Sequence, residues 1–225
     1  MYEERASLLP HVVAWRSVAP PGGDQVRVLP DGCLDLIWRD GEVFVAGPDT
    51  VAEISSSAPG RESFALRFAA GTGAAVVGLP ADELTDLQVP LADLWPGPEV
   101  RRIAEAADPA AALLDAAARR WQDPDPSMVE VAARAEAGQP VEVIAAACGL
   151  SPRQLQRRCR AAFGYGPKTL VRVLRMQRAL GLARRGRALA EVSAVAGYAD
   201  QAHLSRDVKA LAGVPMRTLL TGVDG

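Results

Sequence analysis

Residues 144–167 read IAAACGLSPRQLQRRCRAAFGYGP, and this stretch decides the fold of the C-terminal part of the chain. A short helical pattern stops at Gly149, a residue that tolerates backbone conformations closed to most others. After it, Leu155, Cys159 and Phe163 recur at every fourth position and form one apolar helical stripe. Four arginines within positions 153–160 lie largely away from that stripe. The stretch therefore predicts two helices joined by a tight turn, the second with a basic outer face.

A second copy of this pattern follows in GYADQAHLSRDVKALAG, residues 197–213. Gly149 and Gly197 are 48 residues apart, and one extra residue then enters the second copy. The later matches are 49 residues apart and pair Leu155 with Leu204, Arg157 with Arg206, Arg160 with Lys209 and Gly164 with Gly213. A single basic helix is commonly just a solvated surface. Two basic helices after two glycine turns instead indicate a pair of helix-turn-helix motifs, whose second helices can enter the DNA major groove.

Positive and negative charges are divided unevenly along the 225 residues. Residues 1–127 contain 10 Lys and Arg against 20 Asp and Glu, a net charge of −10. Residues 128–225 contain 15 against 7, a net charge of +8, so the whole chain carries only −2. The basic half predicts a polyanionic partner, and the change of sign predicts a domain boundary near residue 127.

The first 95 residues show short apolar runs separated by turn residues. The runs are HVVAW, VRVL, CLDLIW, EVFVA and SFALRF, and Asp40-Gly41 between two of them is typical of a β-hairpin. We expect a small β barrel or sandwich, followed by a short helical segment around GTGAAVVGLPADEL. The aromatic residues Trp15, Trp38, Phe44 and Phe64 are expected to point into the barrel interior, as core first and as pocket lining second.

The predicted fold class is α+β, with three segments. Residues 1–95 form the small β domain, residues 96–127 a helical connector and linker, and residues 128–225 an all-α DNA-binding domain. The connector holds two short helices broken at Asp108-Pro109 and ends in the stiff, polar sequence QDPDPS. In the last segment we expect helices at about residues 128–138, 141–148, 152–163, 168–185, 189–196, 200–212 and 215–221.

Three segments of the last hundred residues resemble the DNA-binding domain of the AraC/XylS type: IAAACGLSPRQLQRR, FGYGPKTLVRVLRMQRAL and VSAVAGYADQAHLSRDVKALAGV. The resemblance covers both motifs and the linking helix. It implies seven helices, with the long helix at about 168–185 holding two recognition helices on successive major grooves. The second motif departs from the family pattern, because Pro215 comes one place early and Val208 stands where an aromatic residue is usual.

The first domain also has a family likeness. VLPDGCLDLIW, VAGPDT and LRFAAGTGAAVVGLPADEL resemble the small cupin-like sensor domain of some AraC-type regulators. This resemblance implies effector sensing or dimerisation for residues 1–95. The residues that would bind an effector are left unassigned.

The first recognition helix supplies one set of predicted DNA contacts. Arg153, Gln154, Gln156 and Arg157 lie in its first turns, where side chains reach base edges. Arg suits the O6 and N7 atoms of guanine, and Gln suits N6 and N7 of adenine. Arg160, one turn further on, is expected to contact phosphate.

The second recognition helix supplies the matching set. Gln201, Ala202, His203 and Arg206 hold the equivalent positions, and Lys209 is expected to contact phosphate. Ala202 offers only an apolar contact, such as one with a thymine methyl group. A surface histidine without a role is the alternative for His203.

No pattern indicates catalysis, and we expect no catalytic residue, metal site or cofactor. Asp31 and Asp35 have no nucleophile, histidine or metal ligand beside them, so structural roles at a turn and a strand edge are favoured over acid–base chemistry. Cys33, Cys148 and Cys159 are widely spaced and are expected to be reduced and buried. An enzyme tethered to DNA would need a cysteine-rich metal site or a methyl-accepting thiol motif, and the sequence offers neither.

These observations together predict a cytoplasmic, sequence-specific transcription regulator that binds double-stranded DNA in the major groove. A small-molecule effector acts at the N-terminal domain in this interpretation. The alternative is a regulator that binds DNA constitutively and uses the β domain only for dimerisation, and a homodimer is one open arrangement. No membrane partner is expected, because the longest uncharged run, residues 69–81, is too short and too rich in glycine to span a bilayer.

Overall fold

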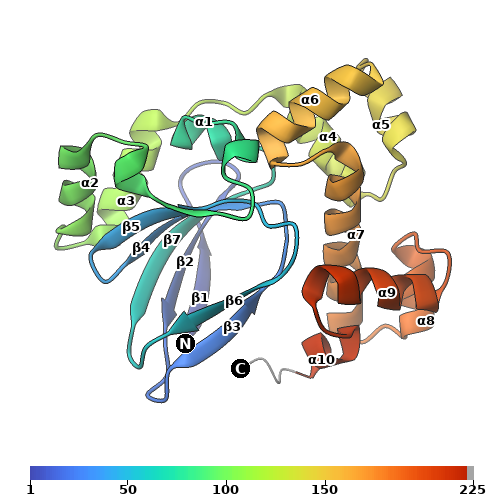
Figure 1. The fold of residues 1–225 in the computed structure, drawn as a ribbon, viewed down its shortest axis with the longest axis horizontal. Helices are drawn as coiled ribbons and strands as arrows, with labels where there is room; N and C mark the ends of the chain where they lie inside the picture. Colours follow the sequence, from blue (N-terminus) through green and yellow to red (C-terminus); the bar gives the residue numbers. More distant parts are fainter. Residues whose placement is uncertain (222–225) are drawn as a thin grey trace.

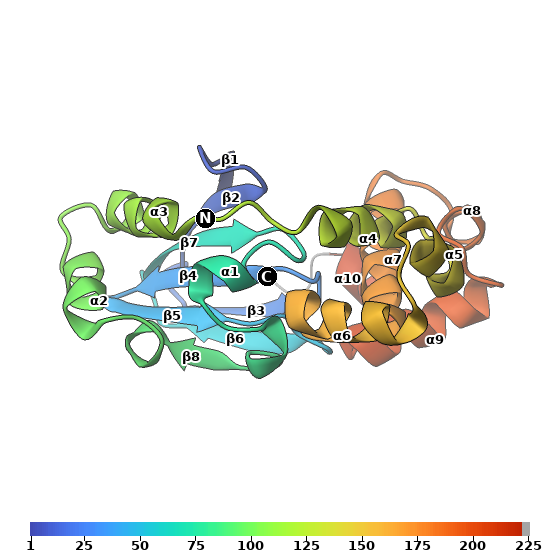
Figure 2. The same cartoon turned by 90° about the horizontal axis from the view of Figure 1, so that it is seen from above.

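The computed structural model describes residues 1–221, so the last four residues of the predicted DNA-binding domain, 222–225, lie outside the described part. The β strands lie in the first 90 residues and form one body, and a helical body stands beside it (Figures 1 and 2). This arrangement confirms the predicted α+β class with a β-rich N-terminal domain and a helical C-terminal domain.

The strands described within residues 1–221 are β1 (Tyr2–Ala6), β2 (Val12–Val18), β3 (Asp24–Val28), β4 (Leu34–Arg39), β5 (Glu42–Ala46), β6 (Glu53–Ser57), β7 (Glu62–Phe68) and β8 (Gln88–Pro90). One antiparallel sheet has the order β1-β2-β7-β4-β5-β8, and β3 pairs with β6 in a second sheet. Asp40 and Gly41 both have positive φ angles, 49° and 83°, and connect β4 to β5. Positive φ at both central residues is what a tight hairpin requires, so the predicted hairpin is confirmed.

The strand register corrects one expectation, that four aromatic residues share the barrel interior. Across neighbouring strands, Trp15 pairs with Ala65, Ala65 with Ile37, and Ile37 with Phe44. Phe64 pairs instead with Trp38. Directly paired residues point to the same face of a sheet. Trp15 and Phe44 therefore lie on one face, and Trp38 and Phe64 on the other. The expectation was wrong because the phase of one strand relative to the next depends on pairing across the sheet, which the pattern within each strand leaves open.

Short helical segments complete the N-terminal body: α1 (Ala74–Val77), η1 (Ala81–Glu83), η2 (Leu91–Asp93), α2 (Gly97–Ala104) and α3 (Pro109–Arg120). The helices α2 and α3 pack on the six-stranded sheet, and Val100, Ile103 and Leu113 belong to the same buried cluster as the strands. Arg120 joins the two helices through two hydrogen bonds of 2.6 Å to Glu99. Residues 96–127, expected as a connector, thus supply part of the core of the β domain.

The helical body contains α4 (Pro126–Glu136), α5 (Val141–Ala147), α6 (Pro152–Phe163), α7 (Pro167–Arg184), α8 (Leu189–Val195), α9 (Gln201–Ala212) and α10 (Met216–Leu220). Each lies within two residues of its predicted bounds. The helix α7 is central, and Leu170, Val173, Met176 and Leu180 on it are fully buried. Val208, where the family pattern has an aromatic residue, is fully buried as well.

Candidate nucleic-acid interface

The first predicted recognition helix, α6, has a well-defined start and end. Ser151 accepts a hydrogen bond from the Gln154 N–H (3.3 Å), and the Gln154 side chain accepts one from the Ser151 N–H (2.9 Å). This reciprocal pair is a capping box, which satisfies two backbone donors that the helix leaves free. At the other end Gly164 adopts φ 82°, a conformation that favours glycine and stops the helix. Sequence signals within a few residues therefore determine the bounds of α6.

The two faces of α6 differ as the periodicity predicted. Leu155, Cys159 and Phe163 are fully buried in the core of the helical body. On the opposite face, the predicted base-contacting residues Arg153, Gln154 and Arg157 are exposed, and Arg160 follows them. Burial of the Cys159 thiol raises its pKa to about 12. The thiol therefore stays protonated and unreactive.

One predicted contact residue on α6, Arg160, has a partner within the protein, and another, Gln156, is exposed but lies close to the turn after the helix. Gln156 lies on the flank of α6, so close to Gly166 that a Cβ atom there would come 2.5 Å from its Nε2 atom. Arg160 forms an ion pair with Asp82 of η1, at 3.4 Å between Nε and Oδ2. Of the contact residues predicted on α6, Arg153, Gln154, Gln156 and Arg157 are thus exposed and form no ion pair within residues 1–221.

The second predicted recognition helix, α9, starts at an aspartate cap. Asp200 accepts a hydrogen bond from the His203 N–H at 2.6 Å. Gln201, Ala202, Arg206 and Lys209 are exposed, as the repeat predicted. The capping residue matches Ser151 of the first motif in position, although its chemistry differs.

His203 is held by the turn in front of α9. Its ring meets Tyr198 edge to face at 5.1 Å between centroids, and its Nδ1 atom accepts a hydrogen bond from the Ala199 N–H at 3.4 Å. The side chain is half-buried. His203 thus stabilises the turn before α9, and its base contact stays a prediction.

A buried carboxylate that the sequence did not single out fixes α9 on α7. The Asp207 side chain is 8% exposed and accepts hydrogen bonds from Arg172 and, at 3.0 Å, from Arg175. Arg175 also stacks on Tyr198, with 4.3 Å between its guanidinium carbon and the ring centroid. The first motif has Arg158 at the equivalent position, and Arg158 bonds instead to Asp125 at the start of α4. The sequence held one signal for the special role of Asp207, which is the change from a basic to an acidic residue between the two copies of the motif.

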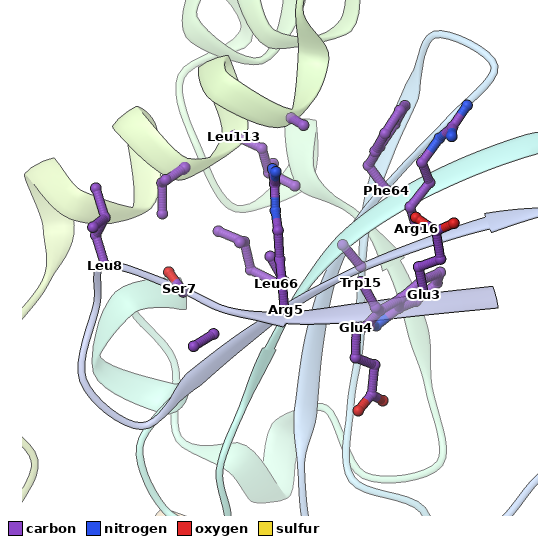
Figure 3. Close-up of a pocket in the computed structure, with 15 residues that line it drawn as sticks. Glu3, Glu4, Arg5, Ser7, Leu8, Trp15, Arg16, Phe64, Leu66 and Leu113 are labelled. Atoms are coloured by element: carbon purple, nitrogen blue, oxygen red, sulfur yellow. The ribbon is translucent and has the colours of Figure 1, made fainter.

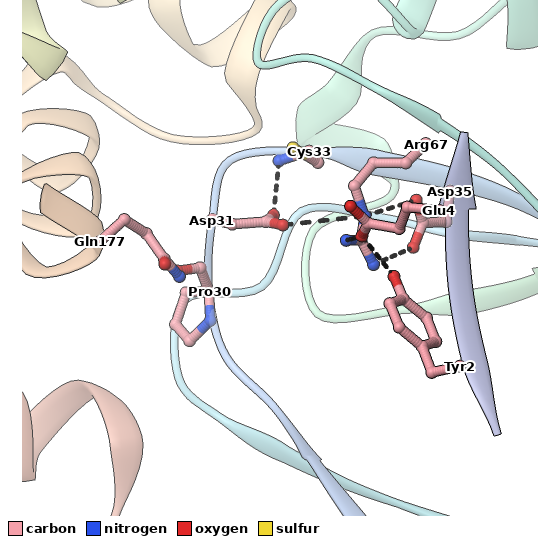
Figure 4. Close-up of polar contacts among 8 residues, drawn as sticks. All are labelled: Tyr2, Glu4, Pro30, Asp31, Cys33, Asp35, Arg67 and Gln177. Carbon is pink, nitrogen blue, oxygen red and sulfur yellow. Dashed lines mark hydrogen bonds and ion pairs between the residues drawn. The ribbon is translucent and has the colours of Figure 1, made fainter. Parts of the chain in front are cut away.

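The cluster around Asp31 and Asp35 has structural contacts (Figure 4). Asp31 accepts the Cys33 N–H at 2.8 Å, which shapes the turn before β4. Arg67 donates two hydrogen bonds of 3.2 Å to Asp35 and reaches Glu4 of β1 at 3.4 Å. Within residues 1–221, no group of three or more His, Cys, Asp or Glu side chains is placed to hold a metal ion.

A pocket of about 470 Å³ lies between the first strands and α3 (Figure 3). Phe64, Leu66, Leu113 and Leu114 give it an apolar lining, and Arg5 points from β1 toward α3. This volume falls within the range typical of small-molecule sites. The pocket lies on the helix-covered side of the sheet, outside the space between the two sheets.

Comparisons with known proteins agree with this geometry. Residues 144–221 match a family model described as a helix-turn-helix domain, and residues 7–90 match one described as a domain of unknown function. The comparison with curated proteins returned no match. A solved structure of ToxT from Vibrio cholerae has a TM-score of 0.52 at 9% identity and covers 100% of this chain and 99% of its own. Unsaturated-fatty-acid-bound ToxT from strain SCE256 has 0.51 at 12%, covering 99% of each chain.

A transcriptional regulator with an AraC-type DNA-binding domain from Chromobacterium violaceum matches over a smaller region. It has a TM-score of 0.40 at 23% identity and covers 43% of this chain and 90% of its own.

The fold and the paired motifs define a two-domain DNA-binding protein of the helix-turn-helix class. In its C-terminal module and in its whole fold the chain is similar to the AraC-type transcription regulators, which confirms the resemblance found in the sequence. None of the helices between residues 1 and 221 has the length and hydrophobicity needed to span a bilayer.

Proposed function

We propose that this protein is a cytoplasmic transcription regulator whose single chain reads one asymmetric DNA site through α6 and α9. The observation that carries the proposal is the pair of capped helices with exposed basic faces, placed in equivalent positions on either end of α7. A recognition helix of this kind places its first turns on base edges in the major groove. This proposal includes the predicted contacts of both helices. Arg160 and Lys209 contact phosphates, and the residues that contact bases are Arg153, Gln154, Gln156, Arg157, Gln201, Ala202, His203 and Arg206.

A small-molecule effector at the N-terminal domain is the second part of the proposal. The pocket beside α3 combines an apolar lining with Arg5 of β1. Its other charged lining residues are Glu3, Glu4 and Arg16, and Arg16 pairs with Glu62. Such a site suits an apolar molecule with an anionic group. The solved ToxT structure of the same fold contains a bound unsaturated fatty acid, which supports this class of ligand. The alternative, constitutive DNA binding with a β domain used only for dimerisation, predicts no ligand in this pocket.

Binding-site selection on the full chain tests the DNA-binding proposal. Arg157→Ala and Arg206→Ala should each weaken binding by about 1–3 kcal/mol and relax the sequence preference in different halves of the site. Lys209→Ala, assigned to phosphate, should weaken all sequences alike and reduce the salt dependence of log K by about one unit. If both arginine variants keep the wild-type preference, or both alter the same half, the two-groove arrangement is wrong.

A further inference from the structure

The two recognition helices end against the N-terminal domain. In Figure 1 both α6 and α9 cross α7 and direct their C-terminal ends toward the β body. The helices end at Gly164 and Gly213, which are equivalent positions in the two copies of the motif. The N-terminal domain therefore meets the same part of each motif.

At the end of α6 the contact is tight. The Thr85 hydroxyl donates a hydrogen bond of 2.9 Å to the carbonyl oxygen of Gly164. A Cβ atom added to Gly164 would come 2.5 Å from the Thr85 oxygen and 2.6 Å from Pro48, so only glycine allows this approach. One helical turn earlier, Arg160 pairs with Asp82.

At the end of α9 the N-terminal domain supplies two hydrogen-bond donors, one from the backbone just before β6 and one from β3. The backbone N–H of Ala52 donates to the carbonyl oxygen of Leu211 at 2.7 Å. Arg27 of β3 donates to the carbonyl oxygen of Ala212 at 3.1 Å. The last carbonyl groups of a helix have no partner within it and carry partial negative charge. A backbone donor and a guanidinium are therefore suited to this end of α9.

A third contact lies between these two. Gln177, in the middle of α7, donates a hydrogen bond of 2.7 Å to the carbonyl oxygen of Pro30 (Figure 4). The N-terminal domain thus bridges the two recognition helices and the helix that links them. The predicted base-contacting residues at the opposite, N-terminal ends of α6 and α9 keep their exposure, apart from the half-buried His203.

We propose that the N-terminal domain is a clamp that fixes the separation of the two recognition helices and so sets the half-site spacing that the protein accepts. The inference rests on the proposed DNA-binding function. In this arrangement α7 supplies one rigid connection between the motifs, and the contacts of Thr85, Ala52 and Arg27 supply a second. Loss of the second connection lets α9 move relative to α6 while each motif keeps its own fold.

A distance measurement without DNA tests the clamp directly. Spin labels are placed at Ala161→Cys and Ala210→Cys, which are exposed, equivalent positions on α6 and α9, in a chain carrying Cys33→Ser and Cys148→Ser. We expect one narrow distance distribution in the otherwise wild-type full chain. It should broaden in the double variant Arg27→Met, Thr85→Val, which removes one side-chain donor at each contact. The control Arg61→Met alters an arginine that pairs with Asp40 within the β body and should leave the distribution narrow.

A DNA measurement then tests the consequence for spacing. Duplexes carry the two selected half-sites at the optimal separation, roughly 10 base pairs, and at separations one and two base pairs longer or shorter. The wild-type full chain should discriminate sharply among them. In the double variant this discrimination should fall by about tenfold, as expected for the loss of two hydrogen bonds, while the sequence preference within each half-site stays unchanged.

The outcomes separate the clamp from the DNA-binding proposal. A narrow label distance together with wild-type spacing discrimination in the double variant would overturn the clamp and leave the proposed function standing. Tighter binding of the optimal duplex by the double variant would also overturn it, because the contacts would then hold an unproductive arrangement. If the wild-type chain shows no sequence preference on any duplex, the proposed function itself fails, and the spacing role falls with it.

Discussion

Asp49 is a single residue whose charge should make stability depend on pH. It lies in the loop between β5 and β6, and burial, followed by the nearby Glu53, Asp86, Asp31 and Asp35, raises its pKa to about 7. A carboxyl group with a raised pKa in the folded state binds its proton more tightly there than in the unfolded chain. The contribution of protonated Asp49 to the free energy of unfolding is therefore complete below its pKa in the unfolded chain, near 4. That contribution is lost as the pH rises through the folded-state pKa, about 7.

Asp49→Asn should remove this loss, because the amide resembles the protonated carboxyl group at every pH. We expect the variant and the wild type to be equally stable at pH 4. At pH 8 the variant should be the more stable by about 1 kcal/mol or less, since the side chain is partly exposed and solvent screens its charge. Urea unfolding at the two pH values measures the difference. A constant difference across this range would show that Asp49 has an ordinary pKa.

At the scale of elements, the placement of α9 on α7 depends on Asp207. Its carboxylate is nearly buried and receives both Arg172 and Arg175, so removing its charge leaves a partly buried cation without a partner. We expect Asp207→Asn to lower the free energy of unfolding by about 2–3 kcal/mol. The exposed pair of Glu130 and Arg134 on α4 is the control, and Glu130→Gln should cost only about 0.3–0.5 kcal/mol.

Denaturant unfolding of both variants checks this difference, and footprinting shows its effect on DNA. Because α9 loses its anchor and α6 does not, protection should weaken first in the half-site read by α9. Equal unfolding free energies for the two variants would mean that Asp207 contributes no more than a surface pair.

At the scale of the whole molecule, an effector should couple the pocket beside α3 to DNA binding. A ligand that binds only the folded state at about 100 times its Kd stabilises it by about 2.7 kcal/mol. We expect long-chain carboxylates to raise the unfolding temperature of the full chain and to change its DNA affinity by a constant factor. By linkage, DNA should then change the affinity for the carboxylate by the same factor.

Two substitutions on α3 provide the matched comparison. Ala110→Trp places a large side chain into the pocket and should abolish the thermal shift, whereas Ala111→Trp on the exposed side of the same helix should preserve it. The thermal shift is also measured with an alcohol of the same chain length. The difference between carboxylate and alcohol gives the contribution of the anionic group. If no carboxylate stabilises the wild type, the constitutive regulator is the better description.

Local sequence signals determined the DNA-binding module almost completely. The capping box at Ser151, the aspartate cap at Asp200 and the glycine ends at Gly164 and Gly213 act within three or four residues, and the apolar stripe of α6 repeats with the period of one helix. Such short-range features exist before any distant contact forms. For the same reason the hairpin at Asp40-Gly41 could be predicted from two residues.

Only the tertiary structure decided which distant surfaces meet. Arg27 and Ala212 are 185 residues apart in the chain, and Thr85 and Gly164 are 79 apart, so no local pattern relates them. Strand register decided which aromatic residues share a face, and packing brought α2 and α3 into the core of the β domain. The sequence by itself therefore determined that this protein carries two reading helices, because caps and periodicity are local. How those helices are held relative to each other was decided by folding, because it depends on hydrogen bonds and close packing between residues that only the complete fold brings together.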